Sequence, residues 1–410
     1  MRSTLYITYD GLLDPLGGSQ ILPYLYGIAN HPRDVYVLSF EKPRRLERRA
    51  ALASELAKHG IRWTPLKFTT GTGFVGNLGK IWDLTRMYAM ALWLAIVGRV
   101  GIVHCRGHVA AQAGALVKRL RGTKLLFDFR GLWVDERVDK GGWDMSRRTH
   151  RWQYQFYKRV ERRLLAKADQ IVVLTEAVAP EVLRLGARGK ERVTVIPCCA
   201  DFDHFPLATV DARTRARERC GLPADALVLG YLGSVGRMYM PERYFRLAEL
   251  AAGHEPRLYL LALTQDPELF RAEMIAALSP HLHPRVEYRS VARAEVAELL
   301  PAMDILVGFI VPSHARMAAS PTKMAEAFAS GVPVICNFGT GDVAELMARL
   351  DAGAIIDADS DTELARVASN LSAIMTKGGA RLRELARRSL GLGVAQARYR
   401  DIYERMDPTC

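Results

Sequence analysis

The chain has 410 residues, 49% of them hydrophobic and 25% charged, which is the composition of a folded protein with room for two or three domains. The net charge of +13 favours acidic partners such as nucleotides or anionic lipid, whereas the lack of zinc-finger spacings and of a basic–aromatic signature argues against nucleic acid. The opening MRSTLYITYD lacks the apolar region of a signal peptide, and no uncharged apolar run reaches the ~18 residues of a spanning helix. Six cysteines with no Cys-x2-Cys spacing exclude a disulfide framework, so we expect a cytoplasmic protein.

The first half of the chain alternates short β-like segments with helical ones. Apolar strands separated by helices predict a parallel sheet covered on both faces. The expected strands are 5–9, 34–40, 102–105, 124–129 and 170–175, and the expected helices include 21–30, 46–59, 110–121 and 147–168.

The segment VTVIPCCADFDHFP, residues 193–206, interrupts this alternation with two prolines and turn-forming aspartates. We therefore predict an α/β fold of two doubly wound parallel-sheet domains, residues 1–205 and 206–391. An amphipathic segment at 394–406 follows the second domain, and its pattern does not indicate which domain it packs on. The strands expected in the second domain are 228–232, 257–262, 286–288, 305–309, 332–336 and 353–356.

The first loop of each domain is a candidate site, because ligands of open parallel sheets bind at the carboxyl ends of the strands. After the first strand, DGLLDPLGGSQ places Gly17 and Gly18 before an expected helix, with Ser19 as its cap. Glycines here let a phosphate approach the backbone N–H groups at the positive end of a helix. An ordinary turn followed by a helix cap is an equally good interpretation of the same residues.

The second domain opens with VLGYLGSVGRMY, in which Gly233 and Gly236 precede Arg237. An arginine beside a glycine loop at the end of a strand suits a bidentate grip on a diphosphate. The alternative is a surface arginine, which is the commonest fate of this residue type. The spacing of the glycines differs from the dinucleotide fingerprint, and this disfavours a dehydrogenase.

Two polar segments follow strands of the first domain, HCRGH from residue 104 and FDFRGLWVDE from residue 127. We expect His104 in the core, whereas packing and function are balanced for His108. We expect Arg130 to be functional, because a charge beside a buried strand needs a partner. Asp135 and Glu136 are expected to pair with neighbouring arginines. The carboxylates form no convincing ligand cluster, so no metal site is predicted.

The segment RRTHRWQYQFYKRVERRLLAK, residues 147–167, is a basic amphipathic helix with eight Lys or Arg residues against one Glu. Its apolar stripe comprises Trp152, Phe156, Val160 and Leu164. We favour packing of this stripe on the sheet, with the charges in water. The alternative is that the helix lies on anionic lipid, and its basic face also suits peripheral attachment to the inner face of a membrane.

Residues 318–334 read AASPTKMAEAFASGVPV, an apolar helix that carries Lys323 and Glu326 just after a proline. The longer segment SPTKMAEAFASGVPVICN, residues 320–337, resembles the donor-binding motif of glycosyltransferase family 4. The glycine pair, VVLTEA, VIPCCADFDHF and GYLGSVGR precede it in the family's order. The resemblance implies a GT-B fold, in which two Rossmann-like domains face each other across a cleft. It also implies that a C-terminal helix, about 392–410, packs back on the N-terminal domain.

The resemblance implies roles for residues on the donor side. Glu326 matches the carboxylate that accepts hydrogen bonds from the ribose hydroxyls, and Arg237 matches the arginine on the diphosphate. Gly17 and Gly18 match the loop that closes over the phosphates and sugar, and the main chain of Val291 falls where the base is met. The backbone that approaches the donor comprises Ser320, Pro321 and Thr322.

Two positions depart from the family pattern. Ala318 stands where many relatives carry a first glutamate, and Glu242 stands where a lysine usually follows the arginine. In a subgroup with an SP-x-K motif the lysine occupies the position of Lys323. Our hypothesis is that Lys323 and Arg237 together neutralise the leaving diphosphate.

The implied activity is that of a retaining hexosyltransferase. It would move a sugar from a nucleotide-diphosphate sugar to a glycan or lipid-linked acceptor, in cell-surface polysaccharide or glycoconjugate synthesis. His108 and Arg130 fall near positions that contact donor or acceptor in the family. The fold normally works without a metal, so we expect no cofactor besides the sugar nucleotide. The alternatives are an epimerase or hydrolase of the same fold and a non-catalytic nucleotide-sugar-binding protein.

Overall fold

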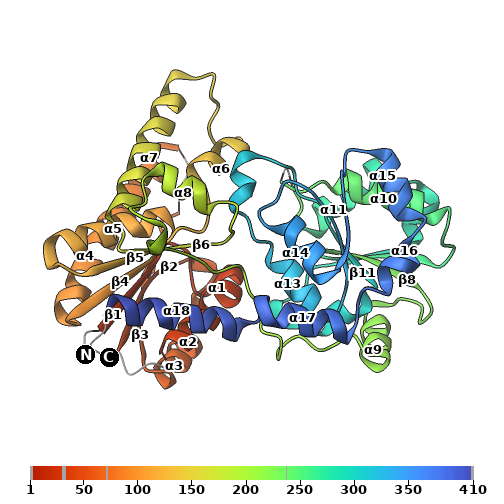
Figure 1. The fold of residues 1–410 in the computed structure, drawn as a ribbon, viewed down its shortest axis with the longest axis horizontal. Helices are drawn as coiled ribbons and strands as arrows, with labels where there is room; N and C mark the ends of the chain where they lie inside the picture. The colour runs from red at the N-terminus through yellow and green to blue at the C-terminus, as the bar shows by residue number, and fades with distance from the viewer. Residues whose placement is uncertain (1–2, 30–33, 71–72, 237, 408–410) are drawn as a thin grey trace. The chain divides into compact units, whose positions relative to one another are not determined.

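The computed structural model describes residues 3–29, 34–70, 73–236 and 238–407. Within these ranges, residues 44–46 and 73–77 are described by their backbone alone. Its contacts divide the chain into two compact units (Figure 1). Unit 1 contains the residues up to Pro197 and those from Gly393 onward, and unit 2 runs from Cys198 to Leu392. The division therefore lies inside the proline-containing segment at which the sequence alternation breaks.

Unit 1 is built on a seven-stranded sheet of order β3-β2-β1-β4-β5-β6-β7, with every neighbouring pair parallel. The central strands β1, β2 and β4 are buried throughout, as expected for strands covered on both faces. The strands are β1 (Ser3–Thr8), β2 (Val35–Glu41), β3 (Ile61–Lys67), β4 (Val100–Arg106), β5 (Lys124–Asp128), β6 (Gln170–Val173) and β7 (Val193–Val195).

The sequence did not predict the two edge strands of this sheet. Strand β3 contains Pro65, which cannot donate to a ladder, and most of its residues are partly exposed. Strand β7 has only three residues and lies in the segment that looked like a break. Edge strands carry a weaker apolar signal, because only part of their surface is covered.

The helices of unit 1 form two layers. Right-handed crossovers place the helices that connect β1 to β3 and those that lead from β3 to β7 on opposite faces of the sheet. In the second layer α5 contacts both α4 and α7, and Figure 1 shows these helices beside the sheet. The helices are α1 (Pro15–Gln20), α2 (Leu22–Ala29), α3 (Arg49–Lys58), α4 (Gly73–Val97), α5 (Gly107–Arg121), α6 (Trp133–Asp139), α7 (Arg148–Lys167) and α8 (Ala179–Leu185).

The stripe on α7 packs only in part. Leu164 is buried, as expected, and Val160 is half-buried. The expectation is wrong for Trp152 and Phe156, whose side chains are 63% and 42% exposed and stack on each other with ring centroids 5.6 Å apart. The amino-terminal half of α7 therefore keeps an aromatic, basic surface in water.

The last helix, α18 (Leu392–Met406), packs on unit 1. Its Gln396 side chain donates to the carbonyl of Pro23 at 2.8 Å, and Arg398 donates to the carbonyl of Val195 at 2.7 Å. The buried residues of α18 include Tyr399, Ile402, Tyr403 and Met406. The chain thus returns from unit 2 to complete unit 1.

Unit 2 has a six-stranded parallel sheet of order β10-β9-β8-β11-β12-β13, with hydrophobic clusters on both faces. The prediction of two doubly wound parallel sheets is confirmed. Its strands are β8 (Leu227–Leu232), β9 (Leu258–Leu263), β10 (Val286–Arg289), β11 (Ile305–Gly308), β12 (Val334–Asn337) and β13 (Gly353–Ile356). Its helices are α9 (Val210–Cys220), α10 (Pro241–Ala252), α11 (Pro267–Ala277), α12 (Arg293–Leu299), α13 (Thr322–Ala329), α14 (Val343–Leu350), α15 (Asp361–Ala368), α16 (Leu371–Met375) and α17 (Ala380–Leu390).

The strand order reverses direction between β1 and β4 in unit 1 and between β8 and β11 in unit 2. In open parallel sheets the carboxyl ends of the strands at such a switch point form the usual ligand site.

Candidate active site

In unit 2, Lys323 lies at the switch point of the sheet. It is the second residue of α13, and its ammonium nitrogen lies 4.4 Å from the ring centroid of Tyr239 and 5.5 Å from that of Tyr231. A methyl group placed on Gly233, directly after β8, would lie 3.8 Å from this nitrogen. A methyl group on Gly308, the last residue of β11, would lie 3.9 Å from Cδ of the same side chain. Lys323 therefore extends between the carboxyl ends of β8 and β11.

The Lys323 ammonium is a cation held against aromatic rings. Within residues 3–29, 34–70, 73–236 and 238–407 it has neither a hydrogen-bond nor an ion-pair partner. Burial lowers its pKa to about 8, and the carboxylate of Glu326 opposes that shift. Cation–π contacts with Tyr231 and Tyr239 favour the charged form but supply no hydrogen-bond acceptor. The site is therefore suited to an anion that accepts from the ammonium.

Glu326 lies one turn further along α13 and is buried. Its Oε1 accepts a hydrogen bond of 2.9 Å from Nη1 of Arg293, the first residue of α12. Burial raises the pKa of Glu326, and the Arg293 guanidinium opposes the rise. The sequence did not identify Arg293, because it lies 33 positions away in the chain and only the fold brings the two together.

The two residues before α13 also have hydrogen-bond partners within unit 2. Ser320 Oγ accepts from the backbone N–H of Cys198 at 3.0 Å, and the Pro321 carbonyl accepts from the N–H of Met324 at 3.1 Å. Pro321 occupies the N-cap position of α13, so Thr322 is its first helical residue. Arg237 lies outside the described residues.

Val291 is buried, and its carbonyl already accepts a hydrogen bond of 2.7 Å from the side-chain amide of Gln265. Gln265 follows β9, so it comes from another strand end of the same sheet. It was not identified from the sequence.

Arg316 was also missed. It lies in the short 3-10 helix His314–Ala318, is buried, and its positive charge lowers the pKa of Tyr239 against the rise that burial causes. Ala318, at the position of the absent first glutamate, is buried in the same turn. The turn that has Ala318 in place of the glutamate therefore carries Arg316, whose charge acts on Tyr239, the ring that Lys323 contacts.

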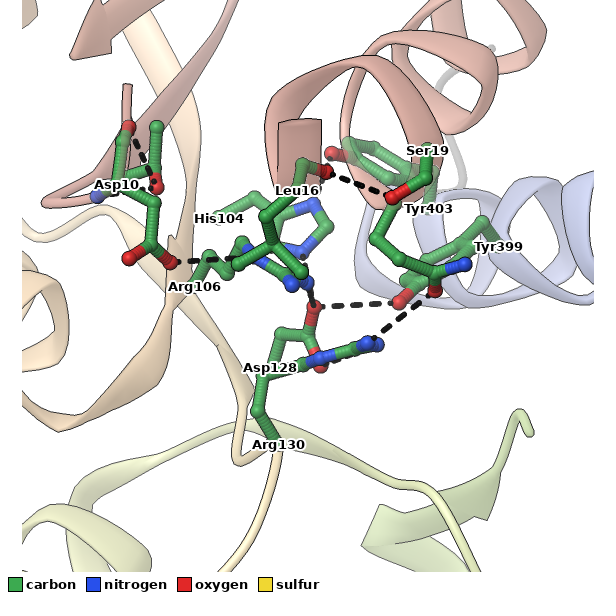
Figure 2. A network of polar contacts seen from close by, with 11 residues as sticks. Asp10, Leu16, Ser19, His104, Arg106, Asp128, Arg130, Tyr399 and Tyr403 are labelled. Atoms are coloured by element: carbon green, nitrogen blue, oxygen red, sulfur yellow. Dashed lines mark hydrogen bonds and ion pairs between the residues drawn. The ribbon is translucent and has the colours of Figure 1, made fainter. Parts of the chain in front are cut away.

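In unit 1, the switch point carries a buried polar network centred on Asp128 (Figure 2). Oδ2 of Asp128 lies 3.4 Å from the hydroxyl of Tyr399, 3.7 Å from Nη1 of Arg106 and 3.9 Å from Nε2 of His104. Oδ1 lies 3.8 Å from Nη1 of Arg130. Asp128 and Arg106 end neighbouring strands β5 and β4, so the network sits at the carboxyl edge of the sheet.

The charges of this network stabilise one another. Burial raises the pKa of Asp128, but Arg130, His104 and Arg106 outweigh it and hold the pKa below its ordinary value. Burial lowers the pKa of His104, so this imidazole is predominantly neutral at pH 7. His104 is buried as expected, and its Nδ1 lies 2.9 Å from the hydroxyl of Tyr403 on α18.

Arg130, the second residue after β5, also belongs to this network. It adopts the left-handed conformation with φ +58°, which is uncommon for a side chain larger than glycine and occurs where the surroundings fix the backbone. Besides Asp128, its guanidinium donates to Oε1 of Gln20 at 3.4 Å. The side chain remains 15% exposed, so one edge of the guanidinium reaches solvent.

The contacts of His108 are those expected if this side chain packs in the core. Its Nε2 lies 2.8 Å from Oε2 of buried Glu161 on α7, and its ring stacks on Trp133. Lys158 donates to both Glu161 and Asp135. The expected pairing of Asp135 with an arginine is therefore wrong, and the same holds for Glu136, whose partner is Lys140.

Gly17 and Gly18 do not lie in a loop. Helix α1 begins at Pro15 with Asp14 at its N-cap position, so the glycines are inside the helix and Ser19 is not its cap. The N–H of Gly18 donates to the carbonyl of Asp14 at 3.1 Å. A methyl group on Gly17 would lie 2.3 Å from the Leu12 carbonyl oxygen, so the close turn before the helix requires a glycine there.

The turn before α1 is held by a residue that the sequence did not single out. The carboxylate of Glu41, at the end of β2, accepts hydrogen bonds from the N–H groups of Leu12 at 2.9 Å and Leu13 at 3.1 Å. It also accepts from the hydroxyl of Ser39 at 2.6 Å. This loop, at the carboxyl end of β1, is therefore fixed by a buried charge.

Among the residues that the structure describes, no three His, Cys, Asp or Glu side chains are grouped as metal ligands would be. No helix in that part of the chain is long and apolar enough to cross a membrane.

Two family models match the chain, one in each unit. The first is described as a glycosyl transferase 4-like domain and matches residues 25–199. The second is described as glycosyl transferases group 1 and matches residues 230–373.

Curated relatives and solved structures agree with these matches. D-inositol 3-phosphate glycosyltransferase from Xylanimonas cellulosilytica is 28% identical over 253 residues, 59% of this chain and 58% of the relative. The enzyme of that name from Thermobispora bispora is 26% identical over 226 residues, 53% of this chain and 50% of the relative. The chain thus aligns with only about half the length of these relatives.

Sucrose-phosphate synthase from Thermosynechococcus elongatus superposes with a TM-score of 0.74 at 16% identity over 100% of both chains. HepE from Anabaena, in complex with UDP and glucose, gives 0.70 at 16% identity over 98% of this chain and 100% of the neighbour.

Two Rossmann-like parallel-sheet units and these structural neighbours define the GT-B fold. Each unit of the chain is therefore similar to a glycosyltransferase domain, the first to a 4-like domain and the second to a group 1 domain.

Proposed function

We propose that the protein transfers a hexose, with retention of anomeric configuration, from a nucleotide-diphosphate sugar to a glycan or lipid-linked acceptor in the synthesis of a cell-surface polysaccharide or glycoconjugate. The observation that carries the proposal is the position of Lys323, an ammonium without an acidic partner among the described residues, at the switch point of unit 2. A diphosphate is an anion that this cation can bind.

On this proposal the leaving group is held by unit 2. Lys323 donates to the diphosphate and, together with Arg237, offsets the charge that develops as the bond between the anomeric carbon and the phosphate oxygen breaks. Glu326, oriented by Arg293, accepts from the ribose hydroxyls through the lone pairs that Arg293 leaves open. Ser320, Pro321 and Thr322 approach the donor through their backbone, and Val291 marks the base.

The acceptor is proposed to meet unit 1 at the Asp128 network. Arg130 presents part of its guanidinium to solvent there and is our candidate for a contact with the acceptor or the donor. The acceptor hydroxyl attacks on the face that the diphosphate leaves, and its proton passes to the departing phosphate oxygen. No side chain is proposed as a nucleophile, and no metal or further cofactor takes part.

Uridine nucleotides are the first donors to test, because HepE from Anabaena was crystallised with UDP and with UDP-glucose. Product formation from UDP-, GDP- and ADP-sugars would be followed with and without candidate acceptors. The proposal predicts nucleotide release that depends on an acceptor. Acceptor-independent release would indicate a hydrolase, and nucleotide binding without any product would indicate a binding protein.

A further inference from the structure

Helix α4 exposes an apolar stripe that no described residue of unit 1 covers. Trp82 and Trp93 are 58% and 54% exposed, and their separation of about 16 Å along the axis, at three full turns, puts them on one side of the helix. We call the exposed set the apolar ridge: Leu78, Ile81, Trp82, Trp93, Ile96 and Val97. An exposed apolar surface of this kind marks an interaction site on a protein in water.

The ridge borders a groove of about 540 Å³ between α4, α5 and α7. Leu116, Val160 and Leu164 give it apolar walls. Three cations also line it, and we call them the basic rim: Arg119, Arg163 and Lys167. All three are exposed and make no ion pair with any residue that the structure describes. Thr85 and Tyr88 of α4 line the same groove, so ridge and groove are continuous.

The exposed charges on the three helices have one sign. Helices α4, α5 and α7 contain only two carboxylates, Asp83 and Glu161, and both side chains are completely buried and ion-paired. Arg121, Arg159 and Arg162 are exposed on the same helices and add to the positive field. A surface that combines exposed tryptophans with unpaired cations and no exposed acid is complementary to an anionic lipid interface.

We propose that the outer face of α4, α5 and α7 docks on an anionic bilayer. The apolar ridge enters the interfacial region, where indole rings are favourable, and the basic rim holds the phosphate of a lipid headgroup in the groove. A second copy of the chain fits less well, because two such faces would bring like charges together. The inference specifies the membrane attachment that a lipid-linked acceptor requires, and it places this attachment on α4 rather than on α7 alone.

The test measures binding of the full chain to phosphatidylcholine vesicles with and without phosphatidylglycerol, at low and at physiological salt. Binding needs no donor or acceptor, so its failure is separate from a failure of transfer. We expect binding only to the anionic vesicles, weakening as salt rises. Replacing the basic rim as Arg119→Gln, Arg163→Gln and Lys167→Gln should lower the partition coefficient by about fivefold per cation, equivalent to about 1 kcal/mol each.

Matched variants in unit 2 serve as controls. Arg215→Gln, Arg271→Gln and Arg349→Gln remove three exposed cations that are also without ion pairs in the described chain. For the ridge, Trp82→Ser with Trp93→Ser is compared with Leu269→Ser with Ile275→Ser, whose side chains are exposed on α11. All of these side chains are exposed, so thermal melting should show folded variants, and only the ridge and rim variants should lose vesicle binding.

The ridge is tested separately by quenching of tryptophan fluorescence with brominated phospholipid. Quenching should fall in the Trp82→Ser, Trp93→Ser variant. The proposal is overturned if the wild type does not bind anionic vesicles at low salt. It is also overturned if the ridge and rim variants bind vesicles as well as the unit 2 control variants. It also fails if the ridge variant merely turns a dimer into a monomer. Inorganic phosphate that binds through the same three cations as tightly as the vesicles would identify a soluble ligand instead.

Discussion

The ammonium of Lys323 lies 4.4 Å from the ring centroid of Tyr239, and the carboxylate of Glu326 one turn away is bound by Arg293 instead. The two charged residues of α13 thus have separate partners. Their i,i+3 spacing alone predicts weak mutual support, whereas the structure places the lysine against aromatic rings and fixes the glutamate from α12.

Lys323→Ala should leave the fold intact and reduce transfer. Loss of one donor to a developing charge typically costs about 3 kcal/mol, so kcat should fall by about a hundredfold. Steady-state kinetics measures this, with Lys323→Arg expected to retain part of the activity. Unchanged turnover in Lys323→Ala would remove the lysine from the mechanism.

The activity should also depend on the protonation of Lys323. Burial lowers its pKa to about 8, so the charged form that binds diphosphate is present below that pH and is lost as pH rises through it. We expect kcat/KM for the donor to fall above about pH 8. The falling limb should move to higher pH in Lys323→Arg, because a guanidinium stays charged. A limb that stays in place in this variant would assign the titration to another group.

Arg293→Ala should make donor binding sensitive to pH. Burial raises the pKa of Glu326 and Arg293 opposes the rise, so without the guanidinium the carboxyl holds its proton to higher pH. The protonated form offers one acceptor fewer to the ribose. Calorimetric titration with nucleotide should show affinity that recovers as pH increases. Arg257→Ala, which removes an exposed arginine elsewhere in unit 2, is the control and should behave as wild type.

Gly17→Ala should destabilise unit 1. The added methyl group would lie 2.3 Å from the Leu12 carbonyl oxygen, in a turn that Glu41 already holds. Overpacking of this kind typically costs about 1–3 kcal/mol, which should be visible as a lower midpoint of thermal unfolding. Gly393→Ala meets no atom within 4 Å and should melt as wild type. Equal melting of both variants would show that the turn before α1 can shift.

Asp128 should contribute to stability at neutral pH. Its pKa is held below the ordinary value despite burial, because Arg130, His104 and Arg106 favour the carboxylate. A depressed pKa gives stability that is present above the unfolded-state pKa and is lost as pH falls through the folded-state pKa. Acid unfolding should therefore be less steep in Asp128→Asn, which should also be less stable at pH 7. An acid transition identical to that of wild type would contradict this role.

The sequence predicted the five inner strands of the first sheet, because burial on both faces produces apolar runs, and all six strands of the second sheet, including its edge strands β10 and β13. It missed β3 and β7, which are edge strands with partly exposed surfaces. It also missed α4, and the reason is physical. Both faces of that helix are apolar, one against the sheet and one exposed, so the 3.6-residue alternation that reveals a helix is weak.

The candidate site was predictable only where it is local in the chain. Lys323 and Glu326 share one helix, and the motif around them is contiguous. Arg293 and Gln265 reach the same region from other strand ends, and a single sequence carries no signal of that proximity. Ser19 was expected to cap a helix, but the helix begins four residues earlier at Pro15, where a proline fits the first turn.

The central claim is that Lys323 binds the diphosphate of the donor. The most direct test is calorimetric titration of wild type and Lys323→Ala with the tightest-binding of UDP, GDP and ADP, and with the corresponding nucleoside. We predict that wild type strongly prefers the diphosphate, and that this preference largely disappears in the variant while nucleoside affinity is unchanged. The same preference for diphosphate in both proteins would contradict the assignment.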